Sequence, residues 1–504
     1  MLCEPYLLDP RPDGIHVVWH TELPGSAHFV LVGPGVAEMS DEQARTAPSE
    51  GPGWRRFAAT THAMSRTRED QESSVPGRTY AGVTRRAVYR QLAAVTGLPA
   101  GRTPYRVVSD GTVTPVYTLA PAVPPDQPVR LLLSSDHQLK PMVPANLAKV
   151  AETAGVAFDG VLMAGDLVNA PDRASEWFDS TAEPAFFPTF ARILPHSPLF
   201  PTIGNHDVMG RWSDTATLDE QFNDPQPDDW DVTTYEELFP VPRSEQGGPR
   251  WWSRTIGDVH VISLFVTQVW RPPELTGRGR FQEAREDVDT PDRWGYGQFI
   301  FEPVTRGSRQ YAFLAAELAA TAARRARYRV VMFHHPSHGL GHGSVPPYTD
   351  PIPVRRDGTI TYDYPLADDH ILRDVEPLVS EAGVHLVLNG HSHVWNRFRN
   401  AAGVHWLDTS NVGNSYGAFD VTSGLSRGMP PGYVQQGDPG GLTPIVPTLA
   451  PLRNADGVPL PYVASNDITV FSLLDSAAGV VRSYRHDTRQ PDSPAVLFDE
   501  FSLR

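Results

Sequence analysis

Side chains that can bind divalent cations follow several short apolar runs along this chain. Each run ends in acidic, amide or imidazole groups, which are common metal ligands in proteins. The stretches are "SSDHQ", "AGDLVN", "IGNHD", "FHHPSH" and "NGHSH", and they offer Asp136, Gln138, Asp166, Asn205, His334, His391 and His393. One stretch alone would be an ordinary turn, because Asp, Asn and Gly are frequent in turns. Five of them, each after a strand-like run, predict a shared metal site.

The donor types suit a pair of metal ions. Two divalent cations about 3.5–4 Å apart need a bridging carboxylate, further donors around them and open positions for water and substrate. Asp166 is the expected bridge, and Asn205 offers a carbonyl oxygen. His391 and His393 are two residues apart, so an extended segment can direct both to one side, toward different ions.

Asp136 and Gln138 follow a Leu-rich run that predicts a buried strand opening into a loop. Side chains alternate along a strand, so these two should share a side. We expect both to face the metals. His137, which lies between them, should point elsewhere, either into packing or toward a ligand that it supports.

His206 and Asp207 are the candidate catalytic residues. His206 follows Asn205 at the expected mouth of the site, where it could donate a proton or a hydrogen bond to a departing oxygen. Asp207 is expected to orient its ring. The alternative for Asp207 is a helix N-cap, where Asp is favoured, and both roles can hold together.

Candidate substrate contacts follow two of the motifs. Arg211 and Trp212 come after "GNHD", and Trp395 and Arg397 come after "GHSH". Arginine can bind phosphate oxygens in a bidentate manner, and tryptophan can stack on a base or a sugar. Packing or an exposed loop is the alternative for each of them.

The composition narrows the classes of partner. The 504 residues carry a formal charge of −16, which argues against a nucleic-acid backbone or an anionic membrane as partner and still allows a small phosphorylated substrate. Cys3 is the only cysteine, so intramolecular disulfides and cysteine-based zinc sites are excluded. Neither a signal-like start nor an apolar run of membrane-spanning length is visible, so we expect a cytoplasmic protein, or a secreted one if an upstream signal was removed.

Two regions with different patterns flank a proline-rich linker at 121–128. Residues 1–120 hold short strand-like runs between turn residues, which predict a small all-β sandwich. Residues 129–504 alternate apolar strands with helical segments, which predicts a layered α/β domain. A large insertion is expected at about 208–309. In such domains, polar residues gather where the strands end.

The motif order is similar to that of the calcineurin-like metallophosphoesterases, from Val129 to about Asp408. The preceding sandwich resembles a fibronectin type III domain, with Trp19 in the core and Tyr105 at a corner between sheets, in the layout of purple acid phosphatases. The resemblance implies an α/β (α+β) layered metallophosphoesterase sandwich with two metal ions. It assigns one ion to Asp136, Gln138, Asp166 and His393, and the other to Asp166, Asn205, His334 and His391. The H-x-P form favours His334, with His335 as the alternative.

The resemblance implies hydrolysis of phosphate esters by a metal-activated hydroxide. Gln138 stands where most of the family has histidine, although some members, including manganese-dependent ADP-ribose pyrophosphatase-like enzymes, carry glutamine. Its amide oxygen favours manganese over iron, zinc or cobalt. Asn169 replaces the iron-binding tyrosine of purple acid phosphatases, so a purple ferric enzyme is not expected. We predict a phosphodiesterase or nucleotide pyrophosphatase; the alternatives are a phosphomonoesterase, or a binding or scaffold protein whose metal site has decayed.

Overall fold

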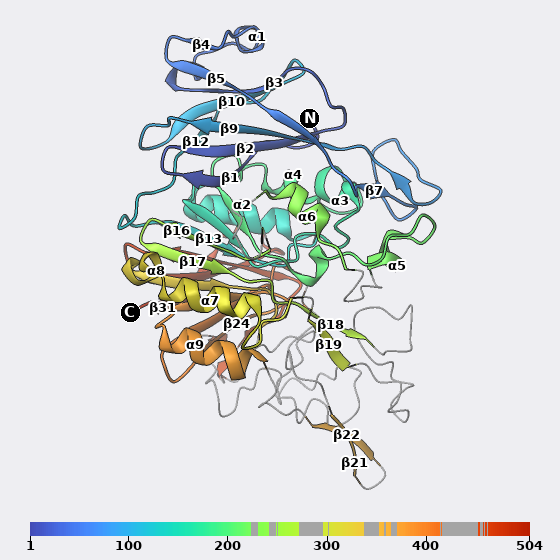
Figure 1. Ribbon diagram of the computed structural model, residues 1–504, viewed down its shortest axis with the longest axis vertical. Helices are drawn as coiled ribbons and strands as arrows, with labels where there is room; N and C mark the ends of the chain where they lie inside the picture. Colours follow the sequence, from blue (N-terminus) through green and yellow to red (C-terminus); the bar gives the residue numbers. More distant parts are fainter. Residues whose placement is uncertain are drawn as a thin grey trace.

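The computed structural model describes residues 1–222, 230–240, 248, 250–271, 296–300, 302–336, 352–356, 359–363, 370–413, 415, 452–453, 457, 459–460 and 462–504. The first strands of the chain stack at one end of the molecule, and the layers that carry the predicted ligands lie below them (Figure 1). In the described part of the chain, no helix has both the length and the apolar character needed to cross a bilayer.

The N-terminal region is a β-sandwich of two antiparallel sheets, as predicted. One sheet has the order β1-β2-β9-β6, and the other has the order β11-β10-β3-β5-β4 with β12 paired to β10. The strands are β1 (Tyr6–Arg11), β2 (Gly14–Thr21), β3 (His28–Val32), β4 (Glu50–Gly51), β5 (Trp54–Ala58), β6 (Thr60–Ala63), β9 (Tyr89–Thr96), β10 (Thr103–Ser109), β11 (Thr112–Val113) and β12 (Tyr117–Leu119). Residues 120–129 form neither helix nor strand.

The core of the sandwich contains the predicted tryptophan. Trp19 is fully buried on β2, and its indole N–H donates to Ser109 on β10. Tyr105 is also buried, but its hydroxyl leaves the sandwich and donates to the carbonyl oxygen of Pro195, 2.8 Å away. The tyrosine therefore ties the sandwich to the next region, a role that no local pattern could predict.

The following region contains two larger sheets, which confirms the predicted layered fold. The first has the order β15-β14-β13-β29-β30-β31 and the second β16-β17-β20-β23-β25-β24-β28. The strands are β13 (Arg130–Ser134), β14 (Gly160–Met163), β15 (Leu199–Pro201), β16 (Trp252–Ile256), β17 (Val259–Ser263), β20 (Tyr328–Met332), β23 (Leu386–Asn389), β24 (Trp395–Arg399), β25 (His405–Thr409), β28 (Tyr462–Val463), β29 (Ile468–Asp475), β30 (Val480–Asp487) and β31 (Val496–Ser502). β16 and β17 fall within 208–309, so part of the predicted insertion belongs to the layered core.

Parallel pairing in both sheets follows from the alternation of strands and helices. β13, β14 and β15 run parallel to one another, and so do β17, β20, β23 and β25. Nearly all residues of these strands are buried, as is usual for parallel strands. Shorter two-stranded sheets pair β7 (Arg68–Glu69) with β8 (Thr84–Arg85), β18 (Gln268–Arg271) with β19 (Tyr296–Ile300), β21 (Ile352–Arg356) with β22 (Thr359–Asp363), and β26 (Leu452–Arg453) with β27 (Pro459–Leu460).

The helices pack on the sheets. Ser308 caps α7 by accepting a hydrogen bond from the backbone N–H of Tyr311, which satisfies a donor at the helix start. α7, α8 and α9 lie together on one side of the molecule (Figure 1). The helical segments are η1 (Pro34–Val36), α1 (Asp41–Arg45), α2 (Val143–Ala154), α3 (Ala174–Phe178), α4 (Phe186–Phe190), η2 (Asn205–Asp207), α5 (Leu218–Phe222), α6 (Thr233–Leu238), α7 (Arg309–Ala319), α8 (Thr321–Arg325), the π-helical η6 (Ile371–Val375) and α9 (Glu376–Glu381).

The sandwich and the layered region share a continuous apolar core. The Tyr6 ring stacks on Phe187 with centroids 4.6 Å apart, and its hydroxyl donates to the carbonyl oxygen of Leu238. His20 is buried beside Phe178, at 5.0 Å between ring centroids. Aromatic packing of this kind buries large areas, so the two regions should move as one body.

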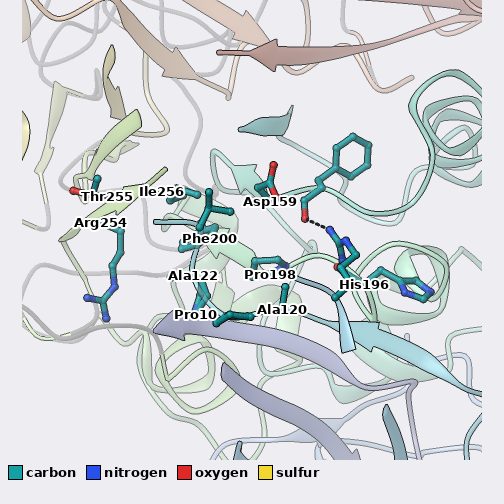
Figure 2. A pocket seen from close by; sticks show the side chains of 14 residues that line it. Pro10, Ala120, Ala122, Asp159, His196, Pro198, Phe200, Arg254, Thr255 and Ile256 are labelled. Carbon is teal, nitrogen blue, oxygen red and sulfur yellow. Dashed lines mark hydrogen bonds between the residues drawn. The ribbon is translucent and has the colours of Figure 1, made fainter. Parts of the chain in front are cut away.

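A small cavity marks another part of this junction. Pro10 and Ala122 line it together with Asp159, His196 and Phe200 (Figure 2). Its volume is about 30 Å³, which holds roughly one water molecule. This part of the junction is therefore closely packed.

Candidate active site

Carboxyl ends of parallel strands from both large sheets meet at one place, and the predicted ligands lie there. Because parallel strands end at the same edge of a sheet, residues far apart in the chain converge. β13 leads to Asp136 and Gln138, β14 to Asp166, β15 to Asn205, β20 to His334, and β23 to His391 and His393. All of these residues are buried.

The side chains assigned to one ion surround the amide oxygen of Asn205. Its Oδ1 lies 3.0 Å from Nε2 of His334 and 2.9 Å from Nδ1 of His391. Nε2 of His334 is also 3.2 Å from Oδ2 of Asp166. Two imidazole nitrogens, an amide oxygen and a carboxylate thus point at a common centre, as ligands of one cation do.

The side chains assigned to the other ion lie next to this group. Nε2 of His393 is 3.4 Å from Oδ1 of Asp136, and the side-chain N–H of Gln138 donates to Oδ2 of Asp166 at 3.4 Å. Asp166 therefore contacts members of both groups, which is the position a bridging carboxylate needs. The donor set present fits two divalent ions.

The order of atoms around His334 favours it as the ligand in "FHHP". Nδ1 of His334 lies 2.7 Å from the carbonyl oxygen of Ala164, so Nδ1 donates a hydrogen bond there and Nε2 is the nitrogen directed at Asn205 and Asp166. His335 stacks on His391 at 3.7 Å between centroids, and its Nδ1 is 3.0 Å from the Thr267 hydroxyl. His335 is close enough to join a metal group with His334 and His391, so it stays the alternative.

The predicted ligands lie in turns. φ is positive at Asp136, Gln138, Asp166, His391 and His393, a region that side chains other than glycine rarely adopt. The expected alternation along an extended strand is therefore wrong as a reason, although Asp136 and Gln138 do lie together. Such strained backbone persists where the surrounding structure enforces it, typically at functional sites.

Two glycines allow the strand ends to approach each other. Gly165 has φ of +91°, and a Cβ there would lie 2.7 Å from both the Gly204 nitrogen and Nδ1 of His334. A Cβ on Gly390 would lie 2.0 Å from the Ser135 hydroxyl. Both contacts are too short for a real Cβ, so these positions need glycine.

The electrostatics of the buried site favour a cation. Burial disfavours the charged form of His334, yet the carboxylates of Asp166 and Asp136 outweigh burial and raise its pKa to about 10. Burial likewise disfavours the carboxylate of Asp166, but His334 and His206 outweigh it and lower its pKa. The excess of negative charge that holds a proton on His334 is the same charge that attracts a divalent ion.

His137 and Asp408 have supporting roles. His137 stacks on Phe190 at 4.8 Å and its Nε2 lies 2.8 Å from the Ser134 hydroxyl, so it packs away from the site as predicted. Asp408 accepts hydrogen bonds from the hydroxyls of Ser392 and Ser410 and so holds the "GHSH" turn. Sequence reasoning missed Asp408, because its link to this turn depends on β24 pairing with β25.

Asp207 does not orient the His206 ring as expected. Nδ1 of His206 lies 2.9 Å from the carbonyl oxygen of Asn169, and its ring packs on Phe222 at 4.7 Å. The Asp207 carboxylate instead accepts hydrogen bonds from the backbone N–H groups of Asp166, Leu167 and Gly204. Asn169, and not Asp207, orients the histidine, because Asp207 is occupied in joining two strand ends.

Two of the candidate substrate contacts are exposed and two are buried. Arg211 and Trp212 are exposed on the segment after His206. Trp395 is fully buried, its indole donates to Ser483, and it packs on Phe498. Arg397 is buried in a bidentate ion pair with Asp499. Trp395 and Arg397 are therefore occupied in the packing of the fold, contrary to the predicted substrate contacts.

A family model described as calcineurin-like phosphoesterase matches residues 130–395, more than half of the chain. The chain belongs to this family. This phosphoesterase is similar in fold to the purple acid phosphatase PPD1 from yellow lupin (Lupinus luteus) seeds, at 15% identity over 99% of this chain and 73% of that one, with a TM-score of 0.57. PhoD matches at 10% identity over 99% and 92% of the two chains, with a TM-score of 0.46. No curated protein matches. Membership and the metal-binding groups make the protein a metal-dependent hydrolase of phosphate esters.

Proposed function

We propose that this phosphoesterase uses two divalent ions, with manganese favoured, to hydrolyse phosphodiester or nucleotide pyrophosphate bonds. The observation that carries the proposal is the position of Asp166, within 3.2 Å of His334 and 3.4 Å of Gln138. Asp136, Gln138, Asp166 and His393 would hold one ion. Asp166, Asn205, His334 and His391 would hold the other.

When bound, the ions would supply a nucleophile at neutral pH and neutralise charge that develops on the phosphoryl oxygens. The chain contributes the positions of the other groups. The Asn169 carbonyl oxygen holds the His206 ring at Nδ1, so Nε2 is the ring nitrogen that would meet the substrate. Through this nitrogen, His206 donates a proton or a hydrogen bond to the departing oxygen.

The charge around His206 supports a diester over a monoester. A phosphomonoester is a dianion near neutral pH, whereas a diester carries one negative charge, so the monoester needs more unpaired positive charge. Arg66, Arg68 and Arg173 lie on the His206 side of the site, and each is paired with carboxylates. These carboxylates are Asp172 for Arg66 and Arg68, and Asp70, Glu176 and Asp219 for Arg173. Paired arginines add little net attraction for a dianion.

Gln138 supports manganese. Its donor is an amide oxygen, and oxygen donors suit manganese better than they suit zinc or iron held by imidazole. Asn169 stands in place of a tyrosine ligand, and its side-chain amide donates to the backbone oxygen of Gln138. That contact supports the Gln138 turn and assigns Asn169 to positioning rather than to metal binding.

The test compares bis(p-nitrophenyl) phosphate with p-nitrophenyl phosphate in manganese, with an Asp166→Asn variant as control. Faster diester turnover that vanishes in the variant is the expected result, and nucleotide diesters and pyrophosphates would follow. Faster monoester turnover would make the protein a phosphatase. Absence of turnover together with no retained metal after manganese loading would overturn the proposal in favour of a binding protein.

A further inference from the structure

One arginine of the N-terminal sandwich contacts both segments that touch the His206 ring. Arg68 lies on β7, in the stretch 64–88 that leaves the sandwich after β6 and returns at β9. β7 projects from the sandwich and lies beside α3 and α5 of the layered region (Figure 1). Only 1% of Arg68 is exposed.

The first segment that touches His206 is the turn 169–173, whose Asn169 carbonyl faces Nδ1 of the histidine. Arg68 holds this turn twice. Its Nη2 forms a 2.6 Å ion pair with Asp172, and its backbone N–H donates to the carbonyl oxygen of Asp172. Asp172 is itself 1% exposed, so the charge pair is shielded from water and resists exchange with solvent.

The second segment is 211–222, whose Phe222 packs on His206. Nη1 of Arg68 donates to Gln221, the neighbour of Phe222, at 2.8 Å, and also to the carbonyl oxygen of Ser213. The Arg68 guanidinium lies 3.9 Å from the centroid of the Trp212 ring. This segment is therefore fastened at both of its ends by one side chain.

Asp70, two residues along the same stretch, fastens the middle of this segment. Its carboxylate accepts a hydrogen bond from the backbone N–H of Leu218, the first residue of α5, at 2.7 Å. Asp70 thus contacts the first residue of the five-residue helix α5. The last two residues of the helix, Gln221 and Phe222, contact Arg68 and His206. A helix this short has little stability of its own, so its position depends on these contacts.

We propose that Arg68 is a positioning residue of the active site, through which the N-terminal sandwich builds the leaving-group wall around His206. The proposal rests on the proposed function, because it takes His206 as the group that assists departure. Loss of Arg68 removes the one side chain that contacts both the turn 169–173 and the segment 211–222, and so loosens them together. Arg66 and Thr234 still contact Asp172. The His206 ring then loses its fixed orientation, which costs turnover where proton donation matters most.

Arg86 provides the matched control. It lies in the same stretch, is 4% exposed, and pairs with Glu69 and Asp179. Neither partner belongs to the segments that contact His206. Arg68→Gln and Arg86→Gln therefore each remove a buried arginine from the same junction, and only the first should change the leaving-group wall. Arg68→Lys is the milder companion, since it keeps the charge for Asp172 and cannot span both segments.

The kinetic measurement is kcat/KM in manganese for a series of diesters whose leaving groups range from p-nitrophenol to simple alcohols. Arg68→Gln should lose roughly 10- to 100-fold on alcohol leaving groups and much less on p-nitrophenol, because misplacement of a proton donor affects poor leaving groups most. The loss in kcat/KM for Arg68→Lys should be intermediate. Arg86→Gln should show the same dependence of kcat/KM on the leaving group as the wild type. If the Arg68 and Arg86 variants share one leaving-group dependence, the proposal is overturned.

A second measurement separates this proposal from the proposed function. Chymotrypsin cleavage after Trp212, identified by mass spectrometry, reports whether segment 211–222 is held. Arg68→Gln should be cut there faster than the wild type and Arg86→Gln, whatever the substrate. Equal cleavage in all three proteins overturns the role of Arg68. Faster cleavage in Arg68→Gln, with no ester hydrolysed by the wild type, overturns the proposed function alone.

Discussion

The imidazole of His206 is oriented by the backbone of Asn169, with Nδ1 2.9 Å from the carbonyl oxygen. The adjacent Asp207 directs its carboxylate at backbone N–H groups of Asp166, after β14, and of Gly204, after β15. Two neighbours in one motif thus have separate tasks, since one faces the leaving group and the other holds the loops together. Substitutions of His206 and Asp207 should therefore have different effects.

Replacing His206 should affect poor leaving groups selectively. We expect His206→Asn to lose about 10²- to 10⁴-fold in kcat/KM for diesters of simple alcohols. The loss should be much smaller for p-nitrophenyl diesters, because p-nitrophenolate departs without a proton. The measurement is kcat/KM for the two ester types, with metal content as control. Equal losses for both would contradict a leaving-group role.

Replacing Asp207 should affect stability and metal retention. Its carboxylate accepts backbone hydrogen bonds on both oxygens, whereas an asparagine offers one acceptor oxygen. Asp207→Asn should therefore lower the free energy of unfolding by about 1–3 kcal/mol and weaken manganese retention through desalting. The leaving-group dependence should stay that of the wild type. If the variant behaved like His206→Asn in kinetics, Asp207 would be the orienting group after all.

Replacing Gln138 with histidine should change metal preference. Gln138 is buried beside Asp166, and an imidazole at this position offers a nitrogen donor of higher affinity for zinc and cobalt. Gln138→His should retain more zinc and cobalt than the wild type after desalting, with a smaller gain for manganese. Metal analysis by mass spectrometry gives the answer. Unchanged retention of all three metals would mean that Gln138 does not contact the ion.

The domain junction should weaken in acid because of His20. Burial lowers the pKa of His20 well below 6.5, so the folded protein keeps the imidazole neutral while the unfolded chain takes up a proton below about pH 6.5. Stability is therefore full above that pH and falls as the pH drops, by up to about 1.4 kcal/mol per pH unit for one histidine. His20→Gln should flatten this decline.

Urea unfolding between pH 8 and pH 5 tests the His20 prediction. The comparison is the difference between wild type and variant at each pH, which removes the effect of all other titrating groups. The two proteins should converge toward pH 5. A constant difference in the free energy of unfolding across this pH range would show that His20 does not cause the loss of stability in acid.

The order of the metal-binding motifs could be predicted because each motif is local. An apolar run followed by Asp166 or by Asn205 predicts a strand that ends in a ligand, whatever the rest of the chain does. Strand alternation does not explain the positions of Asp136 and Gln138, since they lie in turns with positive φ and not in an extended strand. Local patterns therefore identify the residues at a strand end, but they do not give the backbone conformation of those residues.

The roles of Trp395, Arg397 and Arg68 could not be predicted from the motifs beside them. Arg397 pairs with Asp499 and Arg68 with Gln221, partners that are 102 and 153 residues away along the chain. Whether an arginine near a motif meets substrate or a buried carboxylate depends on which strands become neighbours. Sequence alone therefore determined the reaction class and the candidate ligands, because donor types and strand ends are local properties. Only the tertiary structure decided what orients His206, because that depends on packing between segments that the chain keeps far apart.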